Sequence, residues 1–195
     1  RMYMNYNSNK EYLKNIQYHT SDNLDARVVL HERFTPKGNN IWDFVWSHYN
    51  IKRHNKVLEV GCGTGQFWNS SSRNDFRGFD VILSDFSNGM LNSARTNCSS
   101  IKHNFKFEIA DVEKLQYNSH SFDIVLSHFM LYHTTSKNKA IDELKRVLKP
   151  MGWIGIVLIS KDNMDNIFKP AYVIAPEIKF PEPSSQLFSV DEAMA

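Results

Sequence analysis

The chain has few of the residues that mark secreted, metal-binding or membrane proteins. Two cysteines, Cys62 and Cys98, occur in 195 residues, without the density of a disulfide framework or the spacing of a metal site. No stretch approaches the roughly 18 consecutive apolar residues of a membrane span. No basic stretch followed by an apolar one opens the chain at Arg1, so no secretory signal is visible. We therefore expect a cytoplasmic protein with reduced thiols, no membrane contact and no bound metal.

A strong excess of either charge is also lacking. The chain has 23 basic and 21 acidic residues and a formal net charge of +2, far from the concentrated positive field of nucleic-acid-binding proteins. A basic cluster at Lys52, Arg53, His54 and Lys56 is interpreted as solvated surface. A nucleic-acid partner is therefore not expected. A protein partner or a homo-oligomer has no support in the sequence.

No internal repeat or low-complexity tract divides the chain. Its length and its 42% hydrophobic content indicate one α/β domain of ordinary size. Residues 1–55 are expected to form a helical extension, with an apolar stripe at helical spacing that includes Trp42 and Trp46. Residues 56–160 carry the core motifs. Residues 161–195 contain several prolines that disfavour central strands.

Glycine is scarce, yet three of the eight glycines stand at every second position after a short apolar run, as Gly61, Gly63 and Gly65. Such glycines let the backbone turn tightly and let a ligand approach main-chain groups. A dinucleotide fingerprint would need a further glycine where Gln66 stands. Glu59 places an acid two residues before the first glycine, which repels a pyrophosphate and suits a cation. S-adenosylmethionine fits, because it has no phosphate and carries ammonium and sulfonium charges.

The segment from Val57 to Gly65 closely resembles the glycine-rich first motif of class I S-adenosylmethionine-dependent methyltransferases. A second strand, 78–85, ends on Asp85, twenty residues after Gly65. An acid there would accept hydrogen bonds from both ribose hydroxyls. The alternative is that Asp85 caps the following helix, although Ser87 is an equally good cap. Residues 85–91 are similar to the family's segment after strand two.

A third strand, 105–110, ends at Asp111 and Val112, a pair that resembles the adenine-contacting pair of the family. In the family the acid accepts from the adenine amino group, and the next residue offers a backbone N–H and apolar contact. An ordinary turn aspartate is the alternative for Asp111.

A fourth strand, 122–127, and the residues after it resemble the family's strand-four motif. Ser127 and His128 would border the methionine end of the cofactor, because ligands bind beyond the carboxyl ends of parallel strands. His128 is the one histidine with a positional argument for general-base or substrate-orienting work, and a structural histidine is the alternative. His133 resembles a structural histidine of the family. The five-residue spacing between the two does not support a metal site.

A helix over 137–149 should end at Pro150 and lead into a buried strand over 153–159, a pattern very like the family's helix-turn-strand. The family usually has glycine where Met151 stands, which leaves the turn geometry open. The matching segments together cover about 57–159.

The resemblance implies a doubly wound, Rossmann-like α/β fold with a mostly parallel sheet and helices on both faces. It also implies that N-terminal helices within 1–55 form a lid over the cofactor, in which Arg27 pairs with the methionine carboxylate and Tyr18, Tyr3 or Tyr6 closes over the sulfonium. A surface arginine and core tyrosines are the alternatives. The family's last edge strands are not visible in 161–195. The chain is therefore expected to be truncated, incompletely represented or completed by a partner.

The expected function is methyl transfer from S-adenosylmethionine to a small molecule, leaving S-adenosylhomocysteine. The alternatives are an RNA methyltransferase, a non-catalytic S-adenosylmethionine-binding subunit and a nicotinamide-dependent oxidoreductase. His128 is the expected catalytic residue. The expected cofactor-binding residues are Glu59, Gly61, Cys62, Gly63, Gly65, Asp85, Phe86, Met90, Asp111, Val112, Ser127, Arg27 and Tyr18.

Overall fold

The computed structural model describes residues 9–34, 38, 40–70, 76 and 78–160. Within them lies a five-stranded sheet in the order β3-β2-β1-β4-β5, in which every neighbouring pair is parallel. The predicted parallel α/β fold is confirmed. The strands are β1 (Lys56–Val60), β2 (Asp80–Asp85), β3 (Lys106–Ile109), β4 (Phe122–His128) and β5 (Leu148–Val157).

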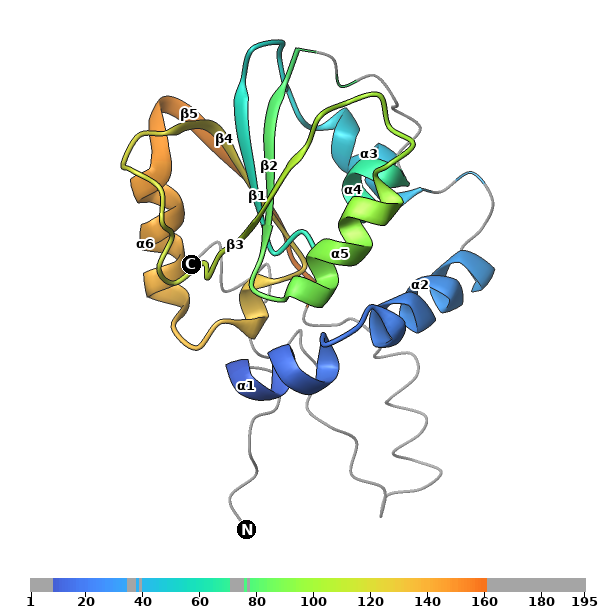
Figure 1. The fold of residues 1–195 in the computed structure, drawn as a ribbon. Helices are drawn as coiled ribbons and strands as arrows, with labels where there is room; N and C mark the ends of the chain where they lie inside the picture. Colours follow the sequence, from blue (N-terminus) through green and yellow to red (C-terminus); the bar gives the residue numbers. More distant parts are fainter. Residues whose placement is uncertain (1–8, 35–37, 39, 71–75, 77, 161–195) are drawn as a thin grey trace.

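Helices cover both faces of this sheet. In Figure 1, α3, α4 and α5 lie on one side, α6 lies on the other, and the N-terminal helices cross below the ends of the strands. Those ends are the carboxyl ends, where ligands of open α/β sheets bind. The helical segments are α1 (Lys10–Tyr12), the π-helical turn η2 (Leu13–Gln17), α2 (Asp22–Phe34), α3 (Ile41–Ser47), α4 (Gln66–Asn69), α5 (Asn88–Asn97), the 3-10 turn η3 (Leu131–His133) and α6 (Lys137–Val147).

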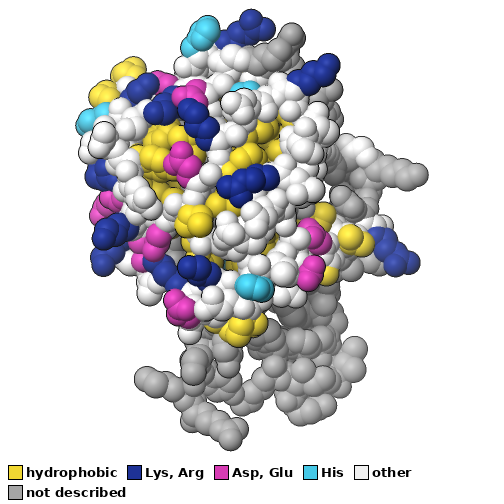
Figure 2. Space-filling model, viewed as in Figure 1, with side chains coloured by type: hydrophobic (Ala, Val, Ile, Leu, Met, Phe, Trp, Pro, Cys, Tyr) yellow, Lys and Arg dark blue, Asp and Glu magenta, His cyan; other side chains and the backbone are white. Residues whose placement is uncertain are grey.

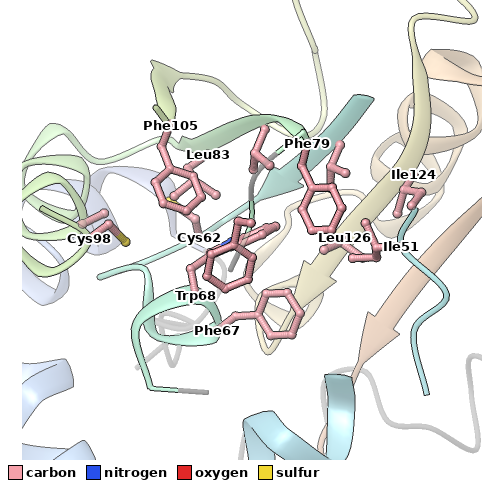
Figure 3. Packing of buried hydrophobic residues seen from close by; sticks show 14 of the residues in the cluster. Ile51, Cys62, Phe67, Trp68, Phe79, Leu83, Cys98, Phe105, Ile124 and Leu126 are labelled. Atoms are coloured by element: carbon pink, nitrogen blue, oxygen red, sulfur yellow. The ribbon is translucent and has the colours of Figure 1, made fainter. Parts of the chain in front are cut away.

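The central strands are apolar on both faces because each face is buried under helices. Alternate residues of β1 enter two separate cores. Val57 joins the core under α3, α4 and α5, and Leu58 joins the core under α6. Figure 3 shows the first core, where Phe67 and Trp68 of α4 pack beneath the sheet near Leu126. This packing fixes the carboxyl end of β1, from which the glycine-rich loop leaves.

The junction of α6 and β5 differs from the prediction. The helix ends at Val147 and β5 begins at Leu148, whereas the sequence predicted a helix to residue 149 and a strand from 153. The residue before a proline avoids the helical conformation, so Pro150 ends the helix earlier. The strand was also predicted to be buried, but Ile156 is 40% exposed because β5 is the last strand of the described sheet.

Met151 adopts a left-handed backbone conformation, with φ of 65°, and its side chain is fully exposed. A side chain in this conformation costs about 1 kcal/mol that glycine does not. We expect Met151→Gly to raise the free energy of unfolding by about 0.5 to 1 kcal/mol, since the gain is partly offset by the greater freedom of the unfolded chain. Urea denaturation measures the change. An equal or lower midpoint would contradict the strain argument.

Positive and negative side chains are interspersed on the face drawn in Figure 2, with no block of one sign. This distribution agrees with the small net charge. No helix among the described residues is long and apolar enough to cross a membrane.

Candidate active site

The glycine-rich loop turns back on itself directly after β1. Gly61, Gly63 and Gly65 have φ values of 66°, 54° and 77°, a region that residues with a Cβ adopt only at a cost. The Cys62 N–H donates to the Ser84 carbonyl at 3.0 Å, which ties the loop to β2. Three left-handed residues in five explain why the sequence needs glycine at every second position here.

Asp85, at the end of β2, holds the loop in place. Its Oδ2 accepts from the Gly63 N–H at 3.0 Å, and its Oδ1 accepts from the Ser87 N–H at 2.9 Å. Burial raises the pKa of this carboxyl to about 6, although both hydrogen bonds oppose the rise. Ser87, not Asp85, is the N-cap of α5, because its hydroxyl accepts from the Met90 N–H. The reading of Asp85 as a helix cap is therefore wrong.

A cavity opens beside this loop, at the carboxyl ends of β1, β2, β3 and β4. Four of the expected cofactor-binding residues line it: Gly61, Phe86, Asp111 and Val112. The remaining lining comes from Lys10, Leu13, Ala110, Glu113, Met130, His133 and Thr134.

Lys10 of α1 binds the acids at the end of β3. Its Nζ donates to Asp111 Oδ2 at 2.6 Å and to Glu113 Oε2 at 2.9 Å. Asp111 Oδ1 also accepts from the Glu113 N–H at 3.0 Å. Asp111 therefore stabilises the turn after β3, as the alternative for this residue held, whether or not it also binds the cofactor. These ion pairs hold the first helix against the wall of the cavity. Because Lys10 and Asp111 are both more than one third exposed, their attraction adds little to stability.

The segment after η2 docks on the start of α5. The Ser87 hydroxyl donates to the Tyr18 carbonyl. The His19 carbonyl lies so close to Gly89 that a Cβ there would be 1.9 Å from the oxygen, which explains a glycine in the first turn of this helix. Leu24 of α2 lies over Gly63. The N-terminal helices therefore contact the glycine-rich loop, the turn after β3 and the start of α5, and they contribute Lys10 and Leu13 to the cavity wall.

Tyr18 and Arg27 lie beside His133, which lines the cavity. The Tyr18 hydroxyl lies 2.8 Å from His133 Nε2. The Arg27 guanidinium donates to the Tyr18 hydroxyl at 3.4 Å and lies 5.8 Å from the ring centroid. Neither residue lines the cavity, and the contacts predicted for them with the carboxylate and the sulfonium stay predictions. Tyr3 and Tyr6, the other expected lid tyrosines, lie outside the described residues.

Glu59 and His128 point into the core under α3 and α4, and not into the cavity. Glu59 Oε1 lies 2.8 Å from His128 Nδ1, and Glu59 Oε2 accepts from Trp68 Nε1 at 2.6 Å. The Tyr49 hydroxyl lies 3.0 Å from His128 Nε2. Both ring nitrogens therefore have partners inside the protein, and the Glu59 and His128 side chains are 3% and 2% exposed. Their predicted roles as cofactor contact and base stay predictions.

The remaining expected residues lie around the loop. Met90 is buried in α5, and Cys62 is buried in the loop, where burial, followed by the charge of Asp85, raises the pKa of its thiol. Ser127 is 1% exposed, and its hydroxyl has no hydrogen-bond partner in the described part of the chain. The Thr64 hydroxyl of the loop is orphaned in the same way. No group of three or more His, Cys, Asp and Glu within the described ranges could hold a metal.

The sequence did not single out Lys10, Leu13, Met130 or Thr134 as cavity residues, and it identified His133 only as structural. Lys10 sits 101 residues from Asp111, so no local pattern could pair them. Met130 follows Phe129, whose φ of 53° is rare for a residue with a Cβ. That turn places the Met130 side chain against Gly61.

A parallel α/β sheet with a glycine-rich loop and an acid at the end of the second strand defines a nucleoside-binding domain. The chain belongs to the methyltransferase domain family, whose model matches residues 58–156. The predicted S-adenosylmethionine-dependent methyltransferase family is thus confirmed. Its cofactor is S-adenosylmethionine, as predicted.

Known relatives agree in sequence and in fold. The ubiquinone/menaquinone biosynthesis C-methyltransferase UbiE of Idiomarina loihiensis is 33% identical over 124 residues, which are 60% of this chain and 49% of the relative. The chain thus spans about half the length of the curated relatives it matches. A SAM-dependent methyltransferase structure from Aquifex aeolicus is 21% identical with a TM-score of 0.59, over 78% of this chain and 74% of that one. The PH0226 protein of Pyrococcus horikoshii OT3 is 25% identical with a TM-score of 0.53, over 91% and 76%.

Proposed function

We propose that this protein transfers the methyl group of S-adenosylmethionine to a small molecule. The observation that carries the proposal is the Asp85 carboxylate, which is tied to Gly63 and Ser87 at the point where a ribose would lie. Membership of the methyltransferase domain family supports the reaction class and argues against a nicotinamide-dependent oxidoreductase.

The residues present fit the cofactor. The left-handed glycines let the loop turn back on itself beside the cavity. The orphaned hydroxyls of Ser127 and Thr64 can be satisfied by a polar ligand. Asp85 would accept from the ribose, and Asp111 with Val112 would hold the adenine. Gly61, Cys62, Gly63, Gly65, Phe86 and Ser127 would complete the binding surface. Met90, Glu59 and His128 would support it from the core.

The N-terminal helices would act as the lid. Their contacts with Asp111, Ser87 and Gly63 surround the place of the adenosyl group. Residues 9–34 would have to move for the cofactor to enter, because α1 and η2 contribute Lys10 and Leu13 to the wall of the cavity.

We propose a quinol as the first acceptor to test. The UbiE relatives are C-methyltransferases of ubiquinone and menaquinone biosynthesis, and the cavity has an apolar wall that includes Leu13 and Met130. The small net charge gives no support to an RNA substrate. We also propose a cytoplasmic location. Fractionation of the source cells would test it.

Calorimetric titration with S-adenosylmethionine, S-adenosylhomocysteine and NADH tests the cofactor. We expect binding of the first two in the micromolar range and no heat with NADH. Loss of the methyl group from labelled cofactor in the presence of reduced 1,4-naphthoquinone would then test the acceptor. Binding of NADH alone would overturn the proposal, and cofactor binding without turnover on any acceptor would favour a non-catalytic binding subunit.

A further inference from the structure

Two polar side chains that lie far apart in the sequence meet at the edge of the cavity. The Tyr18 hydroxyl and His133 Nε2 are 2.8 Å apart across 115 residues of sequence. The two rings stand nearly perpendicular, at 79°, with their centroids 5.3 Å apart. The hydrogen bond therefore comes with an edge-to-face ring contact, which fixes the orientation of both partners.

His133 is held rigidly on the core side. It is the last residue of η3, directly after the carboxyl end of β4, and the two preceding residues, Leu131 and Tyr132, are buried in the core under α6. The imidazole lines the cavity beside Met130 and Thr134. It therefore lies at the carboxyl end of the strand next to β1, on the side of the cavity away from Asp85.

Tyr18 is held on the lid side. Its carbonyl accepts from the Ser87 hydroxyl at the start of α5. The Arg27 guanidinium lies over its ring and donates to its hydroxyl. The lid thus brings the Tyr18 hydroxyl, with the Arg27 guanidinium beside it, to the core histidine.

We propose that Tyr18 and His133 form the proton-accepting pair of the methyl transfer, assembled by closure of the lid over the bound cofactor. The inference rests on the proposed function. It assigns the base to His133 instead of His128, whose two ring nitrogens are bound to Glu59 and Tyr49 inside the core. The acceptor class that it predicts carries a dissociable O–H or N–H proton.

For a quinol acceptor the protons and electrons balance as follows. The acceptor O–H proton passes to the Tyr18 oxygen while the Tyr18 proton passes to His133 Nε2, which leaves an imidazolium. The electrons of the broken O–H bond raise the density on the ring carbon that forms the new bond. The cofactor supplies the methyl group, and its sulfur keeps the electron pair. The ring C–H proton then leaves to water, and the acceptor oxygen takes back the proton held by His133.

Several charged and titratable side chains of the described residues lie around the pair. Arg27 of α2 lies on Tyr18, and the Tyr132 ring lies 4.5 Å from the His133 ring. Lys10, Asp111 and Glu113 share the cavity wall with His133. The two acids are paired with Lys10, so their charge on the imidazole is partly compensated.

The first arm of the test needs no acceptor. Hydrogen exchange of residues 10–27 is measured with S-adenosylhomocysteine bound, in wild type, Tyr18→Phe and His133→Asn. We expect exchange to be about 3- to 10-fold faster in both variants, the size of one lost hydrogen bond. Tyr117→Phe is the control, because it removes a 2.9 Å hydroxyl bond to Glu108 outside the cavity, and it should exchange like wild type.

The second arm follows turnover of reduced 1,4-naphthoquinone against pH. Loss of a general base lowers kcat by about 10² to 10⁴. Both variants should therefore have a low kcat and an almost unchanged KM for the cofactor. In His133→Asn, the fall of kcat at low pH should also vanish. Wild-type exchange in both variants, or wild-type kcat in either, would overturn the inference. If wild type does not methylate this quinol, wild-type exchange in both variants would still overturn the inference. Failure of wild type to bind S-adenosylhomocysteine would instead defeat the proposed function.

Discussion

His128→Ala is expected to lower the free energy of unfolding by about 3 to 5 kcal/mol, because it breaks a buried polar pair and leaves one partner uncompensated. The Glu59 carboxylate would lose its 2.8 Å contact with Nδ1, and the Tyr49 hydroxyl would lose its 3.0 Å contact with Nε2. Burial, followed by the charge of Glu59, already raises the pKa of Tyr49 well above its usual value. The Tyr49 hydroxyl therefore stays neutral and would be left buried without its partner.

The lost ring also leaves a cavity among aromatic side chains. The His128 ring lies 4.5 Å from the Phe67 ring and 5.7 Å from the Trp42 ring, centroid to centroid. Removal of so large a side chain from a packed core adds a cavity cost to the lost hydrogen bonds. For a domain of this size, a total loss of about 3 to 5 kcal/mol corresponds to a melting temperature lower by about 10 °C.

Thermal and urea denaturation of the His128→Ala variant measure the effect. His48→Ala is a matched control, because His48 is exposed at the end of α3 and its removal should change the free energy of unfolding by less than about 0.5 kcal/mol. A His128→Ala variant with wild-type stability and slow turnover would contradict the structural role and restore His128 as the base.

The elements of the core could be predicted from the sequence because their signals are local. The apolar run before Gly61 and the acid at Asp85 each lie within a few residues of the turn that they define. Parallel strands must end at one edge of the sheet, so the four motifs had to converge there. This reasoning located the cavity wall at Gly61, Phe86, Asp111 and Val112, which the structure brings together.

The rest depends on contacts between distant parts of the chain. Lys10 reaches Asp111 over 101 residues, and Tyr18 reaches His133 over 115. Neither pair leaves a periodic trace in the sequence. The direction of a side chain at a strand end was also not determined: His128 is on the same face as Leu126, so it enters the core under α3. His133 lies in η3, after the end of β4, and its side chain lines the cavity instead.

Asp85→Asn is expected to weaken S-adenosylhomocysteine binding by about 10- to 100-fold. The carboxylate can accept from the Gly63 and Ser87 N–H groups and, in the proposed complex, from the ribose hydroxyls as well. Each hydrogen bond to a charged group is worth about 1.5 to 3 kcal/mol. The amide of asparagine would place a donor against one of those N–H groups, so the loop would shift.

The control for this variant lies on the same strand. Asp80→Asn changes a carboxylate at the opposite end of β2, where Asp80 is 45% exposed and pairs with Lys106. It should bind S-adenosylhomocysteine with wild-type affinity. Equal affinity of Asp85→Asn and wild type, by calorimetry, would remove the basis of the ribose assignment.

The pH dependence of wild type follows from the same carboxyl and has opposite signs for binding and for stability. Because the pKa of Asp85 is raised to about 6, the ionised form that accepts from the ribose is lost below that pH, and the dissociation constant of S-adenosylhomocysteine should rise about tenfold per pH unit there. The folded protein without ligand holds this proton more tightly than the unfolded chain. Its free energy of unfolding therefore falls as the pH rises from about 4 through 6, by about 3 kcal/mol from this group.

Asp85→Asn should abolish both trends, since the amide does not titrate. The dissociation constants of wild type and variant are compared at each pH. Titrating groups that are distant from Asp85 affect both proteins equally, so their contribution cancels in the ratio. If the two dissociation constants kept a constant ratio between pH 5 and 8, the charge of Asp85 would have no part in binding. If the ratio of the two dissociation constants instead approached one at low pH, the protein would be keeping an unfavourable buried charge at neutral pH because the cofactor needs it.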